Sequence, residues 1–152
     1  MCIRDRISEG DMINLSAPVG GFSIENTERP QLFIGSGVGM TPLVSMFKKA
    51  ASLNVPTQMI QAVVTEDERP FAQKLDSITA NHEQAQLHLH VKDKEGYLEA
   101  KELEQYLSEQ PEIYICGGTK FLHSIINSLK ELNYDMNHVH FETFIPRLSV
   151  QV

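Results

Sequence analysis

A glycine-rich turn is the segment whose residue types are best suited to hold an anionic ligand. It reads Gly35-Ser36-Gly37-Val38-Gly39-Met40-Thr41-Pro42 and separates an apolar stretch from an amphipathic one. Glycines permit positive φ and let a bulky anion approach the main chain. Thr41 suits the N-cap of a following helix and Pro42 its first position, where free N–H groups and the positive end of the helix dipole favour a pyrophosphate. The alternative is a tight turn that binds nothing.

The spacing within this turn excludes two common phosphate-binding motifs. No Gly-Lys-Ser or Gly-Lys-Thr follows the glycines, so the turn is not the phosphate loop of an NTPase. Gly39 comes two residues after Gly37 and is followed by Met40. The Gly-x-Gly-x-x-Gly fingerprint of an ordinary dehydrogenase is therefore not met either.

Cysteines and histidines are the other residue types that could do chemistry. Cys116 ends an apolar stretch, where a cysteine more often packs as a small hydrophobic residue than reacts. With Cys2 it forms neither a disulfide framework nor a zinc motif. Two pairs among the six histidines share a strand face: His88 with His90, and His138 with His140. No carboxylate or cysteine joins either pair at ligand spacing, which favours surface or sheet-edge histidines over a metal site.

Apolar stretches that alternate with amphipathic ones predict the elements that would position these residues. Strands are expected at 31–34, 58–64, 86–91, 113–116 and 139–141, and helices at 42–53, 100–107 and 121–132. A weaker helical stripe runs through Phe71, Leu75 and Ile78. The alternation predicts an α/β fold, a five-stranded parallel Rossmann-like sheet flanked by helices. The strand that ends at Ile34 should be central, with the glycine turn at the carboxyl edge, where such sheets bind ligands.

The length, composition and net charge of the chain limit the class of protein. A chain of 152 residues suits one well-packed domain, and 41% hydrophobic with 22% charged residues is ordinary for a soluble protein. No apolar run approaches the roughly 18 residues of a membrane helix. The net charge of -7, without a cluster of Lys or Arg, argues against nucleic acid as a partner. The cysteine content fits a reducing compartment, so a cytoplasmic location is expected.

Three motifs in this order resemble the ferredoxin-reductase-like family. The first is the glycine turn that closes on Thr41-Pro42. The second is Tyr114-Ile115-Cys116-Gly117-Gly118 followed by Phe121, and the third is His140-Phe141-Glu142-Thr143-Phe144. Within the family, the sequence is most similar to the C-terminal reductase part of flavohaemoglobins, which are nitric oxide dioxygenases. Residues 10–22, with a strand expected at 12–15, resemble the last strand of the family's flavin-binding barrel and its exit.

The resemblance divides the chain into two units. Residues 1–28 combine a start that looks non-native with the last strand and linker of a flavin-binding barrel, and residues 29–152 form an NAD(P)H-binding reductase domain. The rest of the barrel, and a globin or iron–sulfur partner, would lie outside this chain. We therefore expect the fragment to be inactive alone.

The resemblance also implies which residues bind the nicotinamide cofactor. The glycine turn would hold NAD(P)H together with Gly117, Gly118 and Phe121, although the family usually has proline at the position of Gly118. After Val64 the chain reads Thr65-Glu66-Asp67, without the Ser-Arg pair that grips a ribose 2′-phosphate. Acidic residues beside a ribose repel that phosphate, so Thr65 and Glu66 favour NADH over NADPH.

The remaining roles concern FAD. Cys116 would line the place where the nicotinamide meets the flavin, Phe144 would stack on the flavin ring, and Glu142 would tune the flavin or guide protons. The implied function is hydride transfer from NADH to FAD, which feeds electrons to a haem. One alternative is the reductase component of an iron–sulfur aromatic-ring oxygenase. An alternative of another class is a nucleotide-binding or regulatory domain with no redox activity of its own.

Overall fold

A parallel sheet of five strands forms the centre of the molecule. The computed structural model describes residues 7–17 and 20–143. The strands are β1 (Gln31–Ser36), β2 (Thr57–Val63), β3 (Ala85–Val91), β4 (Glu112–Gly117) and β5 (Val139–Thr143). Their order is β3-β2-β1-β4-β5, and every neighbouring pair is parallel. The predicted fold class is confirmed, with β1 as the central strand.

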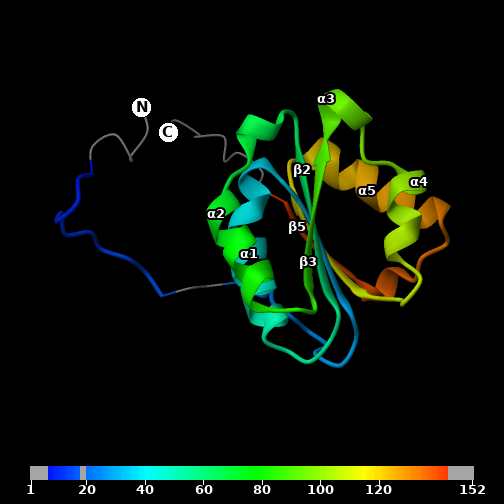
Figure 1. Cartoon of the computed structure of the whole chain (residues 1–152), viewed down its shortest axis with the longest axis horizontal. Coiled ribbons are helices and arrows are strands. Elements are labelled where there is room, and N and C mark those ends of the chain that lie inside the picture. Colours follow the sequence, from blue (N-terminus) through cyan, green and yellow to red (C-terminus); the bar gives the residue numbers. More distant parts are fainter. Residues whose placement is uncertain (1–6, 18–19, 144–152) are drawn as a thin grey trace, which may run out of the picture.

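Helices cover both faces of this sheet. Figure 1 shows α1 (Met40–Ala51) and α2 (Ala72–Asn81) on one side, and α4 (Ala100–Leu103) and α5 (Thr119–Glu131) on the other. A short helix, α3 (Lys92–Glu95), follows β3 directly at its carboxyl end. Single 3-10 turns complete the chain: η2 (Gly37–Gly39), η3 (Glu66–Glu68), η4 (Glu104–Tyr106) and η5 (Met136–His138).

Two apolar cores result, one on each face, because the strands of a doubly covered sheet are apolar on both sides. Phe33 and Met59 of the sheet pack with the buried side of α1 on the first face. Leu32 and Ile34 pack with Leu122, Ile125 and their neighbours in α5 on the second face. The helix predicted at 121–132 therefore buries its apolar face against the sheet.

The first turn of α1 differs from the prediction. The 3-10 turn η2 runs directly into the helix, which begins at Met40 with Gly39 at the N-cap. Thr41 thus lies inside the first turn, where its hydroxyl donates a hydrogen bond to the Val38 carbonyl at 2.8 Å. The predicted assignment of Thr41 as N-cap and Pro42 as first helical residue is wrong, because the tight glycine turn winds helically before Thr41 is reached.

Three other elements also depart from the prediction. Phe71 precedes α2 in a left-handed conformation (φ 60°) and is 42% exposed, so it is not part of the buried stripe of Leu75 and Ile78. The helix expected at 100–107 ends at Leu103 and continues as η4. No strand forms at 12–15, where Met12 and Leu15 are exposed and the chain runs away from the sheet (blue in Figure 1). A strand needs a neighbour to pair with, and the described residues place none beside this segment.

Candidate nucleotide-binding site

The glycine turn and the Cys116-Gly117-Gly118 segment meet at the carboxyl edge of the sheet. Gly35 of β1 pairs with Cys116 of β4, so the two turns that follow these strands are side by side. The chain leaves β1 towards β2 on one side and later returns to β4 on the other. Such a reversal opens a crevice beyond the strand ends, which is where doubly wound sheets bind ligands.

The three glycines of the turn are required for different structural reasons. A β-carbon on Gly39 would overlap the carbonyl group of Cys116 and lie 2.5 Å from the Gly117 nitrogen, so Gly39 lets the turn approach β4. A β-carbon on Gly35 would lie 2.6 Å from Met40 Sδ. Gly37 has φ +53° and no atom near the position of a β-carbon. Its backbone is therefore open to a ligand.

The N-termini of two long helices flank the same crevice. α1 begins just after β1, and α5 begins just after β4 with Gly118 at its N-cap. Neither helix has an acidic residue in its first turn, so no carboxylate there competes with an anion for the positive ends of the helix dipoles. Gly118 has φ -67° and ψ 157°, a conformation that the family's usual proline also adopts.

A cavity of about 300 Å³ opens beside the turn. Its inner wall consists of residues that end β1 and β2 and begin α5: Ser36, Gly37, Ala62, Val63, Val64 and Phe121. A β-carbon on Gly117 would lie 2.8 Å from Ser36 Oγ and 2.7 Å from Phe121 Cδ1, so this glycine lets both side chains approach. The cavity size is at the lower end of the range for small-molecule sites.

The outer wall of the cavity comes from β3 and the segment around α3. It includes Glu68, His90, Lys92, Gly96, Tyr97 and Leu98. His90 Nε2 lies 3.0 Å from the Gly96 carbonyl oxygen, and the Lys92 ammonium lies 4.5 Å from the centre of the Tyr97 ring. The second contact places a cation and an aromatic ring together in the lining of the cavity.

The structure brings only some of the predicted residues to this cavity. Ser36, Gly37 and Phe121 line it, whereas Met40 is fully buried in the core under α1. Val38 and Thr41 are exposed on the turn, and Pro42 is partly exposed beside them. Met40 therefore supports the turn from inside and does not face the cavity. Phe144 lies outside the described residues.

The acidic residue at the cavity is one that the sequence analysis did not select. Glu66 points to Lys94, with 2.8 Å between Oε2 and Nζ, and Thr65 precedes η3 without lining the cavity. Glu68, two residues further on, does line it. The 3-10 turn η3 rotates successive residues by about a third of a turn each, so Glu66 and Glu68 face different directions. The sequence shows three consecutive acidic residues, Glu66-Asp67-Glu68, but it does not show which of them faces the cavity.

Cys116 is buried, and Glu142 lies next to it. The two residues are paired in the β4–β5 ladder, and Cys116 belongs to the core on the α1 side. Burial, with a smaller contribution from Glu142, raises the pKa of the Cys116 thiol to about 11. The thiol is therefore neutral near pH 7, and contact with a nicotinamide stays a prediction for this residue.

We expect Cys116 to resist alkylation while the protein is folded. In a Cys2→Ser background it is the one remaining thiol, and iodoacetamide reacts with thiolates. At about pH 8 the folded protein should label at least about tenfold more slowly than the urea-unfolded chain, because the pKa is raised and access is blocked. Stability that depends on the neutral buried thiol should be lost as the pH rises from about 9 towards about 11. Equal labelling rates in the folded and unfolded states would contradict this assignment.

The two histidine pairs have different neighbours in the structure. His88 lies beside Gln58 and Tyr106, and burial lowers the pKa of its ring. His138 and His140 both contact Glu112, at 2.7 Å and 2.8 Å. Glu112 is far away in the sequence and becomes a neighbour of this pair because β4 and β5 are adjacent strands. Among residues 7–17 and 20–143, no group of three or more His, Cys, Asp or Glu side chains is arranged to hold a metal ion.

Comparison with known families identifies the kind of domain that contains this site. The family model described as the oxidoreductase NAD-binding domain matches residues 33–126, which include the glycine turn, Cys116 and the start of α5. The chain belongs to this family. The cavity beside Gly37 thus lies in an NAD-binding domain, and the cofactor of this domain is NAD(P)H.

Flavohemoproteins are among the relatives of this chain. The flavohemoprotein of Bacillus cereus is 28% identical over 165 residues, which cover 98% of this chain and 41% of that protein. Flavohemoprotein B of Dictyostelium discoideum is 27% identical and covers 96% of this chain and 38% of that protein. This NAD-binding domain therefore spans about two fifths of the length of these relatives.

Solved structures share the fold. The FAD/NAD-binding domain of nitric oxide dioxygenase from Vibrio cholerae has a TM-score of 0.72 and 25% identity, and the match covers 86% of this chain and 57% of that one. Human Ncb5or, solved with NAD+, has a TM-score of 0.75 and 21% identity over 91% of this chain and 44% of that one. Within the described part of the NAD-binding domain, no helix has the length and apolar character needed to cross a membrane.

Proposed function

We propose that this NAD-binding domain binds NADH and positions it to donate a hydride to FAD, from which electrons pass to a haem. The observation that carries the proposal is the cavity of about 300 Å³ whose wall includes Gly37, with its positive φ and uncovered backbone. A pyrophosphate fits such a turn, since the first turns of α1 and α5 contain no competing carboxylate.

The relatives support the choice of haem as the final acceptor. Proteins that are named flavohemoproteins match nearly the whole chain at 27% and 28% identity, and the ferredoxin reductase of carbazole 1,9a-dioxygenase shares the fold at 17% identity. Most of the flavin site, and the whole of the haem site, would be supplied by residues outside this chain. Residues 29–152 would be the nucleotide-binding unit, and residues 1–28 would lead to it from the flavin-binding barrel.

The protein's part in this chemistry is to bind, orient and exclude water. Bound NADH supplies the hydride, and the flavin accepts it. Gly37 and the start of α1 would hold the pyrophosphate, while Lys92 and Tyr97 would close the outer side of the cavity. Gly39 fixes the turn against the β4 backbone, so a pyrophosphate bound at the turn would be held beside the strand that carries Cys116. Cys116 acts by position alone, because its thiol is neutral.

The first test separates nucleotide binding from flavin reduction. We expect the 152-residue chain to bind NADH weakly in calorimetry, and to hold no stoichiometric flavin and oxidise no NADH in its absence. Joined to the flavin-binding barrel of its parent protein, the same domain should reduce the flavin in stopped-flow measurements. If the folded chain bound no NADH under any condition, the proposal would be refuted. A chain that retains yellow flavin by itself would refute the assignment of the flavin site to other residues.

The preference for NADH should depend on Glu68. Its carboxylate lines the cavity, so it would repel a ribose 2′-phosphate. Glu68→Gln should improve NADPH binding by about fivefold to tenfold and change NADH binding by less than about twofold, on the scale of one screened surface charge. Glu66→Gln is the matched control, because Glu66 is paired with Lys94 and does not line the cavity. An equal effect of both variants on the NADPH:NADH ratio would contradict the role of Glu68.

A further inference from the structure

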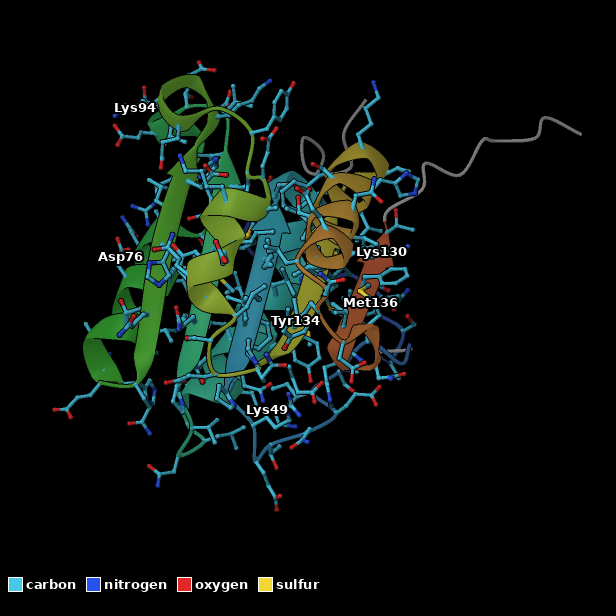
Figure 2. All side chains as sticks on the ribbon, turned by 90° about the vertical axis from the view of Figure 1, so that its right-hand side faces the viewer. Lys49, Asp76, Lys94, Lys130, Tyr134 and Met136 are labelled. Carbon is cyan, nitrogen blue, oxygen red and sulfur yellow. The ribbon has the colours of Figure 1, made fainter. Side chains whose placement is uncertain are left out.

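A second polar cluster lies at the amino end of the sheet, away from the nucleotide cavity. Its members are Arg29 from the segment before β1, Glu112 at the start of β4, Asp135 and His138 around η5, and His140 of β5. Figure 2 shows Tyr134, which borders this cluster, at the opposite end of the sheet from Lys94. The cluster therefore belongs to a different part of the molecule from the site described above.

Glu112 is the centre of the cluster. Its side chain is only 4% exposed, and a buried carboxylate must be paired. One oxygen lies 2.7 Å from His138 Nδ1, and the other lies 2.8 Å from His140 Nε2. A carboxylate accepts hydrogen bonds, so both of these ring nitrogens carry a proton.

Arg29 determines the state of the other nitrogen of His138. Arg29 Nη1 lies 3.2 Å from His138 Nε2. A guanidinium group has five donors and no acceptor, so this contact is a hydrogen bond only when Nε2 is unprotonated. For this arrangement we therefore assign a neutral His138, with its single proton on Nδ1. A proton added at Nε2 would place two cationic donors against each other.

The other groups around His138 determine which partner its ring would bond after protonation. Asp135 Oδ2 lies 3.8 Å from His138 Nε2 and could receive the new proton donor. A hydrogen bond from the Asn137 backbone lowers the pKa of Asp135, so its carboxylate stays charged. Burial raises the pKa of Tyr134 to about 12, and this phenol stays neutral. His140 also faces Glu112, but its ring stacks on Tyr114 at 4.9 Å between centres and does not contact Arg29 through a hydrogen bond in the described residues.

We propose that His138 is a proton-operated latch: neutral His138 accepts a hydrogen bond from Arg29 Nη1, whereas protonated His138 loses this contact and turns to Asp135. Arg29 then keeps its contacts to Gln110 and Glu112. Arg29 belongs to the segment that leads into β1, and its side chain also bonds the Gln110 carbonyl before β4. The latch thus controls one of the contacts that attach this segment to the sheet. Others remain after release, including the hydrogen bond from the Glu25 N–H to the Tyr114 hydroxyl. The latch does not depend on nucleotide binding.

NMR on the complete chain tests the latch in two steps. First, long-range proton–nitrogen spectra should identify the Nδ1–H tautomer of His138 at about pH 8, above the usual titration range of histidine. Second, the solvent exchange of the Arg29 Nη1 protons should be compared between the natural chain and His138→Asn. Asparagine keeps a donor near the position of Nδ1 and removes the acceptor at Nε2, so it imitates the released state.

The latch gives a specific pattern in this comparison. At about pH 8 the Nη1 protons should exchange about tenfold faster in His138→Asn than in the natural chain, the order expected for loss of one hydrogen bond to a charged group. When the pH is lowered to about 5, the two rates should converge to within about twofold, because a proton on Nε2 removes the acceptor from the natural chain as well. His123→Asn, an exposed substitution on α5, should behave as the natural chain at both values. An Nε2–H tautomer, or equal rates at about pH 8, would overturn the proposal.

Discussion

Replacing Gly39 with alanine should destabilise the fold by about 3 kcal/mol, near the top of the range for an overpacked site. The added β-carbon would overlap the carbonyl group of Cys116 and lie 2.5 Å from the Gly117 nitrogen. These are backbone atoms of β4, which is paired on both sides with β1 and β5 and cannot retreat without breaking the sheet. Urea unfolding followed by circular dichroism measures the loss.

Gly118→Ala is the matched control for this experiment. A β-carbon on Gly118 would meet nothing within 4 Å, and the φ of -67° suits alanine. We expect its free energy of unfolding to stay within about 0.5 kcal/mol of the natural chain or to rise slightly, because alanine reduces the entropy of the unfolded chain. If Gly39→Ala were as stable as Gly118→Ala, the turn and β4 would not be in the close contact described above.

The elements that could be predicted from the sequence are those with a strong local pattern. The buried side of α5, with Leu122, Ile125 and Leu129, repeats every three or four residues and was found correctly. The five strands and the central place of β1 followed from the alternation of apolar stretches. The strand expected at 12–15 failed because a strand is defined by its partner, and the apolar pattern of one segment cannot supply one.

The parts of the fold and of the site that could not be predicted depend on contacts between distant residues. Glu112 precedes His138 by 26 positions, and only the pairing of β4 with β5 brings the carboxylate to the ring. Gly39 is required because a β-carbon there would overlap the Cys116 carbonyl group on another strand. No local sequence rule distinguishes this glycine from Gly37. Glu66 and Glu68 are equally acidic in the sequence. Only the rotation of η3 decides which of them faces the cavity.

Gly37 should be the position where a substitution weakens nucleotide binding most. It lines the cavity with φ +53°, and a side chain there would meet no protein atom within 4 Å. The space that a side chain would occupy is therefore the space that we assign to the pyrophosphate. Gly37→Val should weaken NADH binding by about 100-fold, or about 2.7 kcal/mol. It should also cost on the order of 1–2 kcal/mol of stability, because a β-branched residue resists a left-handed conformation.

A second variant distinguishes steric blocking from backbone strain. Asparagine tolerates the left-handed region far better than valine does, so Gly37→Asn should unfold close to the natural chain. It still places a side chain against the ligand, and NADH binding in calorimetry should fall by at least about tenfold. If Gly37→Asn bound NADH as tightly as the natural chain, while Gly37→Val lost both binding and stability, strain alone would explain the valine result. The pyrophosphate would then have to lie elsewhere along the crevice, nearer to the start of α5.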